Sequence, residues 1–419
     1  MEPFELKKEL SLGTGIFTPK NPKGRAAENY EADYTLIKKL GLTHCRLELQ
    51  WPKIEPVRRI FDTYSLLRYK KAIEYMRYLG ISCQVVLFRF DAPEWFNKAG
   101  GFESELGEEM YLEYVRKVTE SLGETAEEFI TFEEPNAYAQ KSRYLAQLPP
   151  YKMSKTDYIK TMAHITSAHR SAYELIHSLQ RGSRSESRVS FTMNMCLFEP
   201  AESYSRLQEN SAKKKERDQF SLYKALATGR AAYPLKKYIG SAKKGKSFLD
   251  FHSIAYGGRK SVGGVENQVK GKVPIDDNFV DFYPEGVLEC VRRVKELFPL
   301  PVYVAMGVAD NGESFRIKYL YELLRNLSLN PNDVERLYFY SFADGDEYGE
   351  EKLLKYGLFT EAEETGGRRE KKSAAFLEEL IAAGALSPKM CEEYKGFFYK
   401  TKLTQGITAE KSADLAAEE

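Results

Sequence analysis

The chain has 419 residues, and its 62 Lys and Arg nearly cancel its 61 Asp and Glu, which leaves a formal net charge of +1 at pH 7. This balance excludes a whole-protein electrostatic field that would favour nucleic acid, and no apolar run reaches the length of a membrane span. The five cysteines are odd in number and contain no Cys-x-x-Cys pair, so they fit reduced core thiols in a cytoplasmic protein with no metal or other cofactor.

The first half of the chain repeats one unit, a buried strand followed by an amphipathic helix. A short apolar run predicts a strand at 11–17, and the spacing of Tyr34, Ile37 and Leu40 predicts a helix over 30–40. The same pattern then predicts three more strand and helix pairs: 43–50 with 64–79, 82–88 with 108–122, and 128–133 with 155–179.

The second half continues this alternation. Strands are expected at 188–194, 248–254, 302–306 and 336–342, and helices at 212–229, 285–298, 313–327 and 373–386. Eight strands alternating with helices, without Gly-x-Gly-x-x-Gly after the first strand, predict an α/β protein with a (β/α)8 TIM barrel. We expect this barrel to occupy residues 1–386 as a single domain, and residues 387–419 to form a C-terminal extension whose end is frayed.

Two long connections interrupt the pattern, at 194–246 and 255–281. Both follow strand ends, so barrel topology places them over the face on which the active sites of such barrels lie. Their lysines would attract an anionic ligand, and the alternative is that they are solvated surface residues.

The stretch TFEEPN, residues 131–136, ends the buried strand at 128–133 with two adjacent carboxylates, Glu133 and Glu134. A carboxylate at the point where a buried strand enters a loop is well placed for acid/base chemistry. The alternative is that both glutamates face solvent.

Four segments at strand ends carry a specific pattern: RLELQWPKIEP from Arg46, LFRFDAPEWF from Leu87, TFEEPN from Thr131 and YSFADGDEYGE from Tyr340. In this order they are similar to RFSISWSRIEP, HFDLPQWL, TFNEP and WSLLDNFEW of the β-glucosidases of glycoside hydrolase family 1. The chain therefore resembles this family over almost the whole barrel, from about residue 11 to about residue 380. The resemblance implies a glycoside-binding cleft at the C-terminal face of the barrel.

The resemblance also implies roles for single residues. The retaining mechanism of the family uses two carboxylates about 5 Å apart, an acid/base and a nucleophile. Glu134 matches the acid/base, whereas Met306 stands where the nucleophile is expected, and a thioether cannot supply the covalent step. The residues implied to bind substrate are Arg46, Trp51, Arg89 in a histidine position, Glu133 in an asparagine position, Tyr340 in a tryptophan position, and Glu347.

Strand parity adds an argument about charge. If Arg46 points into the barrel, Glu48 does so too, because side chains two residues apart on a strand share a face. Buried charges need partners, so we expect Glu48 and Glu133 to balance the positive charges of Arg46 and Arg89. In this arrangement Glu133 lies beside Arg89. The alternative is that Arg46 and Glu48 form a purely structural ion pair.

Three functions stay open. The first is a remodelled glycosidase or transglycosidase in which Glu134 is the general acid and water or a substrate group replaces the enzyme nucleophile. The second is a catalytically inactive pseudo-glycosidase that acts as a binding or interaction module, and the third is retaining hydrolysis with a displaced nucleophile such as Glu48. The expected partner is a carbohydrate or glycoside ligand, whose sugar and anomer the sequence leaves open together with the oligomeric state.

Overall fold

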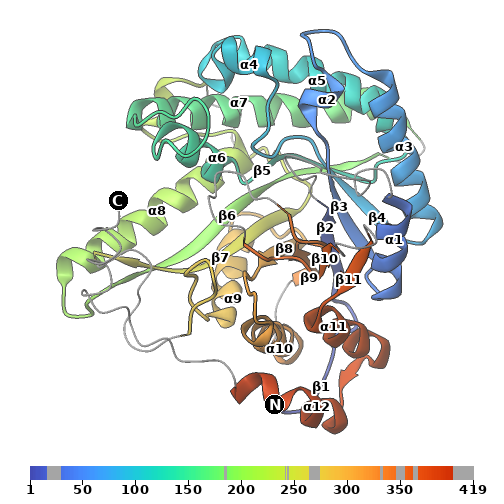
Figure 1. Ribbon diagram of the computed structural model, residues 1–419. Helices are drawn as coiled ribbons and strands as arrows, with labels where there is room; N and C mark the ends of the chain where they lie inside the picture. Colours follow the sequence, from blue (N-terminus) through green and yellow to red (C-terminus); the bar gives the residue numbers. More distant parts are fainter. Residues whose placement is uncertain are drawn as a thin grey trace, which may run out of the picture.

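The computed structural model describes residues 1–16, 30–183, 186–240, 242, 245–263, 274–330, 334–345, 354–361 and 367–399. Eight parallel strands form a closed barrel in chain order. They are β2 Ser11–Ile16, β3 His44–Glu48, β4 Ser82–Val86, β5 Glu128–Glu133, β6 Arg188–Pro200, β7 His252–Val262, β8 Val302–Gly307 and β9 Val334–Tyr340. The predicted TIM barrel is confirmed, with its helices arranged around the strands (Figure 1).

Each predicted helix is present between barrel strands or after the last one. They are α1 Tyr30–Lys39, α3 Thr63–Tyr78, α5 Gly107–Leu122, α7 Lys155–Gln180, α8 Arg206–Thr228, α9 Val287–Lys295, α10 Ser314–Leu329 and α11 Lys372–Ala383. Side-chain caps fix three of the starts, among them that of α8, where the Ser205 hydroxyl accepts the backbone N–H of Gln208. The Asp62 carboxylate accepts the backbone N–H groups of Tyr64 and Ser65 at the start of α3. The Ser154 hydroxyl accepts that of Asp157 at the start of α7.

Shorter elements fill the connections. They are the helices α2 Trp51–Ile54, α4 Glu94–Lys98 and α6 Pro135–Arg143, the 3-10 turns Gly101–Glu103, Leu235–Lys237 and Pro284–Gly286, and an antiparallel pair, β10 Phe359–Glu361 with β11 Arg368–Glu370. Of these, α6 matters most for function, because it follows the predicted acid/base directly.

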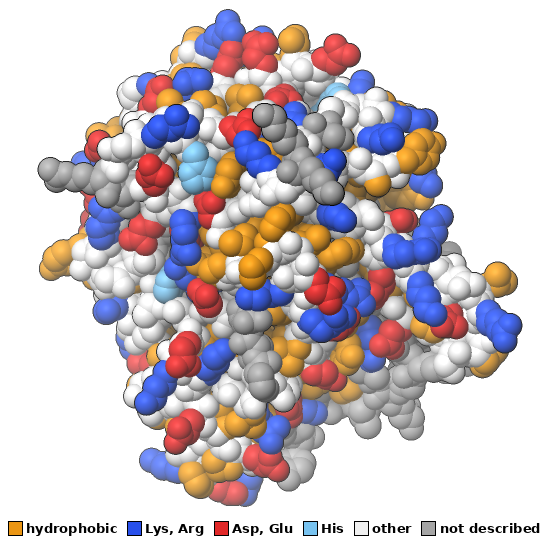
Figure 2. Space-filling model, turned by 180° about the vertical axis from the view of Figure 1, so that it is seen from behind, with side chains coloured by type: hydrophobic (Ala, Val, Ile, Leu, Met, Phe, Trp, Pro, Cys, Tyr) orange, Lys and Arg blue, Asp and Glu red, His pale blue; other side chains and the backbone are white. Residues whose placement is uncertain are grey.

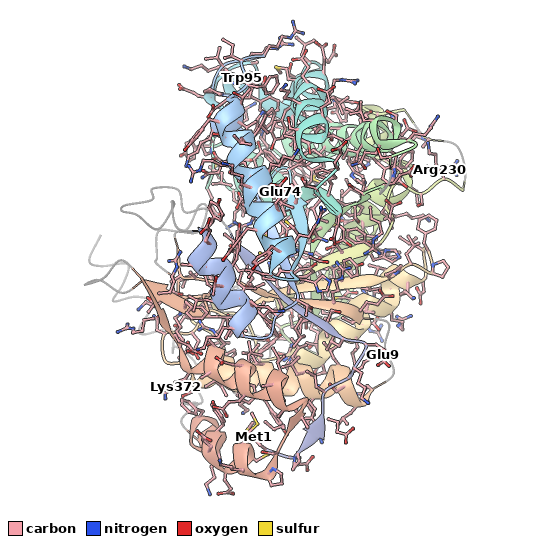
Figure 3. The ribbon with its side chains drawn as sticks, turned by 90° about the vertical axis from the view of Figure 1, so that its right-hand side faces the viewer. Met1, Glu9, Glu74, Trp95, Arg230 and Lys372 are labelled. Carbon is pink, nitrogen blue, oxygen red and sulfur yellow. The ribbon has the colours of Figure 1, made fainter. Side chains whose placement is uncertain are left out.

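The start of the C-terminal extension packs against the barrel. Strand β12, Ala385–Leu386, pairs with β1, Phe4–Glu5, and helix α12, Pro388–Tyr399, follows with Met390 buried. The N-terminus lies beside these elements (Figures 1 and 3). Residues 400–419, and with them the predicted frayed end, lie outside the described residues.

The expected connections at 194–246 and 255–281 are in part strands, which corrects the prediction. Residues 197–200 of β6 pair with residues 259–262 of β7 beyond the barrel rim, after a register shift next to Met195. The backbone groups on the facing edges of the two segments thus satisfy each other, and the side chains of Leu197 and Val262 are buried. Helix α8 covers its edge, where Gln219 exchanges two hydrogen bonds of 3.0 and 2.9 Å with the backbone of Cys196.

A column of buried polar side chains runs through the barrel. Gln84 Nε2 donates to Glu128 Oε2 (2.8 Å), and Arg46 Nε donates to Gln84 Oε1 (2.6 Å). Arg46 Nη1 then donates to Glu133 Oε1 (3.0 Å), and the guanidinium lies 4.4 Å from the centre of the Tyr338 ring. Buried charges are tolerated only when they are paired and hydrogen-bonded, so this column ties β3, β4, β5 and β9 together.

We predict that Arg46→Met lowers the free energy of unfolding by about 3 to 5 kcal/mol, because it leaves the Glu133 carboxylate buried without its counter-charge. Urea denaturation followed by circular dichroism measures the change. The double variant Arg46→Met/Glu133→Leu removes both charges and is expected to recover at least half of the loss. A double variant no more stable than the single one would contradict the pairing.

Stability is also expected to fall in acid because of His169, which is fully buried. Its Nε2 lies 2.8 Å from the Phe248 carbonyl oxygen and its Nδ1 2.7 Å from Thr131 Oγ1, so the neutral ring donates at Nε2 and accepts at Nδ1. Burial lowers the pKa of His169 from 6.5 to about 4. The folded state therefore binds fewer protons than the unfolded state between these values, and stability present above pH 6.5 is lost as the pH falls toward 4.

His169→Gln, which can make both hydrogen bonds but does not titrate, should flatten this dependence by up to about 3 kcal/mol over that range. The free energy of unfolding in urea at pH 7, 6, 5 and 4 provides the test. His252, whose pKa is also lowered to about 4 by burial, leaves a residual slope of the same sign in both proteins. An unchanged slope in the variant would assign the acid sensitivity to other groups.

Candidate functional site

A cleft of about 2030 Å³ opens at the C-terminal ends of the barrel strands. Its walls come from α6, α8, the ribbon formed by β6 and β7, and the segment 274–281. The structure brings six of the predicted site residues together on its lining: Arg46, Arg89, Glu133, Glu134, Met306 and Tyr340. A smaller hollow of about 730 Å³ along the outside of α5 contains none of them.

The two arginines of the cleft floor are paired with Glu133 and Glu48, but not in the expected combination. Glu133 binds Arg46 at 3.0 Å, whereas Arg89 Nη1 lies 3.9 Å from Glu48 Oε2. The predicted pairing of Glu133 with Arg89 and the alternative pair of Arg46 with Glu48 are therefore wrong. The pairing differs because the long Arg46 side chain extends across the barrel. It reaches Glu133 on β5, and its Nη2 also donates to Ser253 Oγ on β7 (2.7 Å).

Arg89 is held at the floor by aromatic and acidic neighbours. It is buried, its Nη2 donates to the hydroxyl of Tyr340, and its guanidinium lies 4.9 Å from the centre of that ring. Together with the Glu48 contact this fixes the planar guanidinium between a carboxylate and a phenol. Arg89 and Tyr340 thus form one unit at the side of the cleft floor.

Glu133 is 3 % exposed, and its Oε1 accepts from Arg46. Its Oε2 is buried and accepts no hydrogen bond from the described residues. An ionised carboxylate is a pure acceptor, so an unsatisfied oxygen at this depth is costly. The side chain is committed to neutralising Arg46.

Glu134 occupies a special backbone position between β5 and α6. Its φ of 49° is the left-handed conformation, which is uncommon for a residue with a side chain. Its backbone N–H donates to the Thr192 carbonyl at 2.7 Å, and Pro135 then starts α6. The turn sends two consecutive carboxylates to different places, Glu133 into the barrel and Glu134 to the half-buried wall of the cleft.

Asn194 positions Glu134, and the sequence analysis did not identify it. Its Nδ2 donates to Glu134 Oε2 at 3.4 Å. The Asn136 side chain binds the backbone of Asn194 twice: its Nδ2 donates to the Asn194 carbonyl (2.9 Å) and its Oδ1 accepts from the Asn194 N–H (3.2 Å). These two hydrogen bonds anchor the backbone of Asn194 to α6. The sequence did contain a signal for Asn194. It is a polar residue at the end of the strand predicted at 188–194, and this end of the strand lies at the same level of the barrel as TFEEPN.

The other predicted site residues differ in where they lie. Met306, 5 % exposed, is near the end of β8 and lines the cleft with its thioether. The structure does not bring Trp51 to the cleft, because this ring is fully buried, stacks on Tyr114 at 4.8 Å and donates from Nε1 to Glu55 Oε2 at 2.8 Å. Glu347 lies outside the described residues.

A buried carboxylate that the sequence analysis missed, Asp276, holds the opposite wall. It accepts backbone N–H groups from Asn278 (2.9 Å), Val280 (2.8 Å) and Ala309 (3.1 Å), which fastens the segment 274–281 to the loop after β8. Burial raises the pKa of Asp276 to about 6, although the three hydrogen bonds act in the opposite direction. Its role is to shape the cleft wall.

In the part of the chain that the structure describes, no group of three or more His, Cys, Asp and Glu side chains is arranged to hold a metal ion. Within the same residues no helix is both long and apolar enough to cross a membrane.

Known proteins with this fold share the architecture over nearly their full length. A β-glycosidase from Pyrococcus horikoshii superimposes with a TM-score of 0.80 at 22% identity, covering 94% of this chain and 98% of its own. A family 1 β-glucosidase from Thermotoga maritima, in complex with isofagomine lactam, superimposes with a TM-score of 0.79 at 17% identity and covers 92% and 100%. These likenesses establish the fold.

Sequence comparison adds the family. The human cytosolic β-glucosidase is 23% identical over 384 residues, which cover 79% of this chain and 81% of that protein. The chloroplastic galactolipid galactosyltransferase SFR2 of Arabidopsis thaliana is 21% identical over 354 residues, or 78% of this chain and 53% of that protein. The sequence model described as Glycosyl hydrolase family 1 matches residues 25–250, more than half of the chain. The chain therefore belongs to glycosyl hydrolase family 1.

Proposed function

We propose that the cleft binds a glycoside and that Glu134 acts as its general acid/base. The observation that carries this proposal is the placement of Glu134, which a left-handed turn and Asn194 hold at the wall of a large cleft, whereas Glu133 and Glu48 lie against arginines. A carboxylate in such a position can protonate a leaving oxygen or deprotonate an attacking group. The aryl or sugar oxygen of the glycosidic bond would be its reaction partner.

On the same proposal, Met306 holds the position of the family's nucleophile. A neutral thioether cannot form the glycosyl-enzyme ester of a retaining mechanism, so water or a hydroxyl of a second substrate would attack the sugar directly. The relative named as a galactolipid galactosyltransferase supports a transfer reaction of this kind. The proposed activity is thus a remodelled glycosidase or transglycosidase.

A second candidate is a pseudo-glycosidase that binds a sugar-like ligand without turning it over. The charge pairs of the floor favour it, because Glu133 and Glu48 are both engaged by arginines and neither is a ready substitute for the missing nucleophile. This function predicts no turnover over a broad panel of glycosides together with saturable binding that Tyr340→Ala weakens.

The identity of the ligand and the oligomeric state stay predictions. The cytoplasmic location also stays a prediction, since relatives named as cytosolic and as chloroplastic both match.

We predict that Glu134→Gln lowers the turnover of phenyl β-D-glucopyranoside by about 100-fold or more, because its poor leaving group needs a proton in the transition state. Met306→Ala should change turnover by less than about threefold, since the thioether takes no chemical part. Phenol release measured by chromatography gives both rates. Glu124→Gln, which removes an exposed carboxylate outside the cleft, is the matched control. Equal losses in the Glu134 and Met306 variants would exclude the assigned roles.

Met306→Glu should place a carboxylate at the nucleophile position and raise the rate of phenol release by about tenfold or more. The variant should also form a covalent adduct with 2,4-dinitrophenyl 2-deoxy-2-fluoro-β-D-glucopyranoside, detected by intact mass, whereas the wild-type protein should form none. Met306→Gln controls for the polarity of the new side chain, and near-UV circular dichroism for folding. A wild-type adduct would instead favour a displaced nucleophile such as Glu48, and a folded Met306→Glu protein without adduct would contradict the position given to Met306.

A further inference from the structure

The outer cleft has a wall that is strongly basic, although the chain as a whole is nearly neutral. Away from the cleft, on the side seen in Figure 2, positive and negative side chains are interspersed. The basic wall is formed by α6, α7, α8 and β7 and contains five lysines and one acid: Lys141, Lys155, Lys214, Lys215, Lys260 and Asp218.

The acids of the opposite wall keep their negative charge, but each of them is held by partners on its own side of the cleft rather than by the lysines. Asp276 accepts three backbone N–H groups, and Asp277 Oδ2 accepts that of Asn311 at 2.7 Å. Asp281 lies 3.3 Å from Arg259. Lys155 and Lys214, by contrast, form no salt bridge with any residue in the described part of the chain. A ligand that lies against the basic wall would therefore meet more ammonium groups than carboxylates.

Apolar and aromatic side chains lie between the lysines. Lys215 Nζ is 5.7 Å from the centre of the Phe198 ring, and Lys141 Nζ is 5.9 Å from that of Phe90. At the rim, Tyr151 is 63 % exposed and faces the same cleft. Rings of this kind bind the body of an apolar group, and ammonium groups beside them bind an anion attached to it. The wall is complementary to both at once.

The basic wall begins next to the proposed acid and runs outward from it. Cys196 Sγ lies 3.4 Å from Asn194 Oδ1, and Asn194 in turn binds Glu134. Burial raises the pKa of Cys196, and the nearby ammonium of Lys260 opposes this rise, so Lys260 lies within electrostatic reach of the same thiol. A glycoside with its glycosidic oxygen at Glu134 would thus direct its leaving group along the lysines.

From this arrangement we infer that the outer cleft selects glycosides whose aglycone combines an aromatic or alkyl body with an anionic group, a carboxylate or a sulfonate. The inference rests on the proposed glycoside-binding function and adds the class of aglycone. Because four of the five lysines are exposed, the preference depends on ionic strength and is largest at low salt.

Two probes of the same shape test the preference: 4-carboxyphenyl β-D-glucopyranoside and its neutral analogue, 4-carbamoylphenyl β-D-glucopyranoside. With the full chain, isothermal titration at pH 7.5 in about 20 mM NaCl should give about tenfold tighter binding of the carboxylate, and a difference below about threefold in 500 mM NaCl. Equal affinities for the two probes at low salt would overturn the inference.

The variant Lys214→Gln/Lys215→Gln/Lys260→Gln assigns the effect to the wall. It should abolish the preference while the affinity for the neutral probe stays within about twofold. Lys213→Gln/Lys224→Gln removes the same kind of charge from the same helix, at exposed positions that do not line the cleft, and should keep the preference. A preference that survives in the triple variant would overturn the assignment.

A sugar-free pair separates the aglycone inference from the glycoside function. If 7-methoxycoumarin-4-acetic acid binds in a lysine-dependent way, its amide does not, and neither glucoside binds, then the basic wall is supported and the glycoside function is overturned. If both glucosides bind equally well, the function stands and the inference fails. If none of the four probes binds, both are overturned.

Discussion

The buried guanidinium of Arg46 is the constraint on which the rest of the site depends. It is 1 % exposed, and a charge at that depth must have its partners within the barrel. Its donors reach Gln84, Glu133 and Ser253, which stand on three different strands. Each of these strands is therefore held in register by the same group, and Gln84 passes the constraint on to Glu128 near the other end of the barrel. The polar column is as much a part of the core as the apolar side chains around it.

This constraint also separates the two carboxylates of TFEEPN. Glu133 must stay beside Arg46, so it lies inside the barrel, and the left-handed turn at the next residue points Glu134 the other way. Asn194, fixed by Asn136, then holds the carboxylate at the cleft wall. Two adjacent and chemically identical side chains thus acquire different tasks from the turn between them and from their different neighbours, one as a counter-ion and one as the candidate acid.

The fold could be predicted from sequence because it follows local patterns: the strand at 128–133 was predicted residue for residue, and most of the major helices within a few residues at each end, although α8 begins at Arg206 and not at residue 212. Details of the site that depend on contacts between residues far apart in the chain could not be predicted in this way. Parity showed that Arg46 and Glu48 enter the barrel, but not that the longer side chain crosses to β5. The ribbon beyond residue 194 depends on the pairing of residues 197–200 with residues 259–262, which are far apart in the chain, and the three backbone contacts of Asp276 exist only in the folded chain.

The charge pairs also bear on what kind of ligand the cleft accepts. If Met306 stands at the nucleophile position, as proposed, the floor lacks the anion that would face its arginines, and Glu48 and Glu133 supply that charge from within the barrel. The two guanidiniums are then balanced without a ligand, so a ligand gains little by bringing an anion to the floor. A preference for charge must arise where the protein leaves charge uncompensated. On the basic wall, Lys155 and Lys214 form no salt bridge in the described part of the chain, so a ligand of the proposed kind would meet the acid Glu134 at one end and selection by charge at the other.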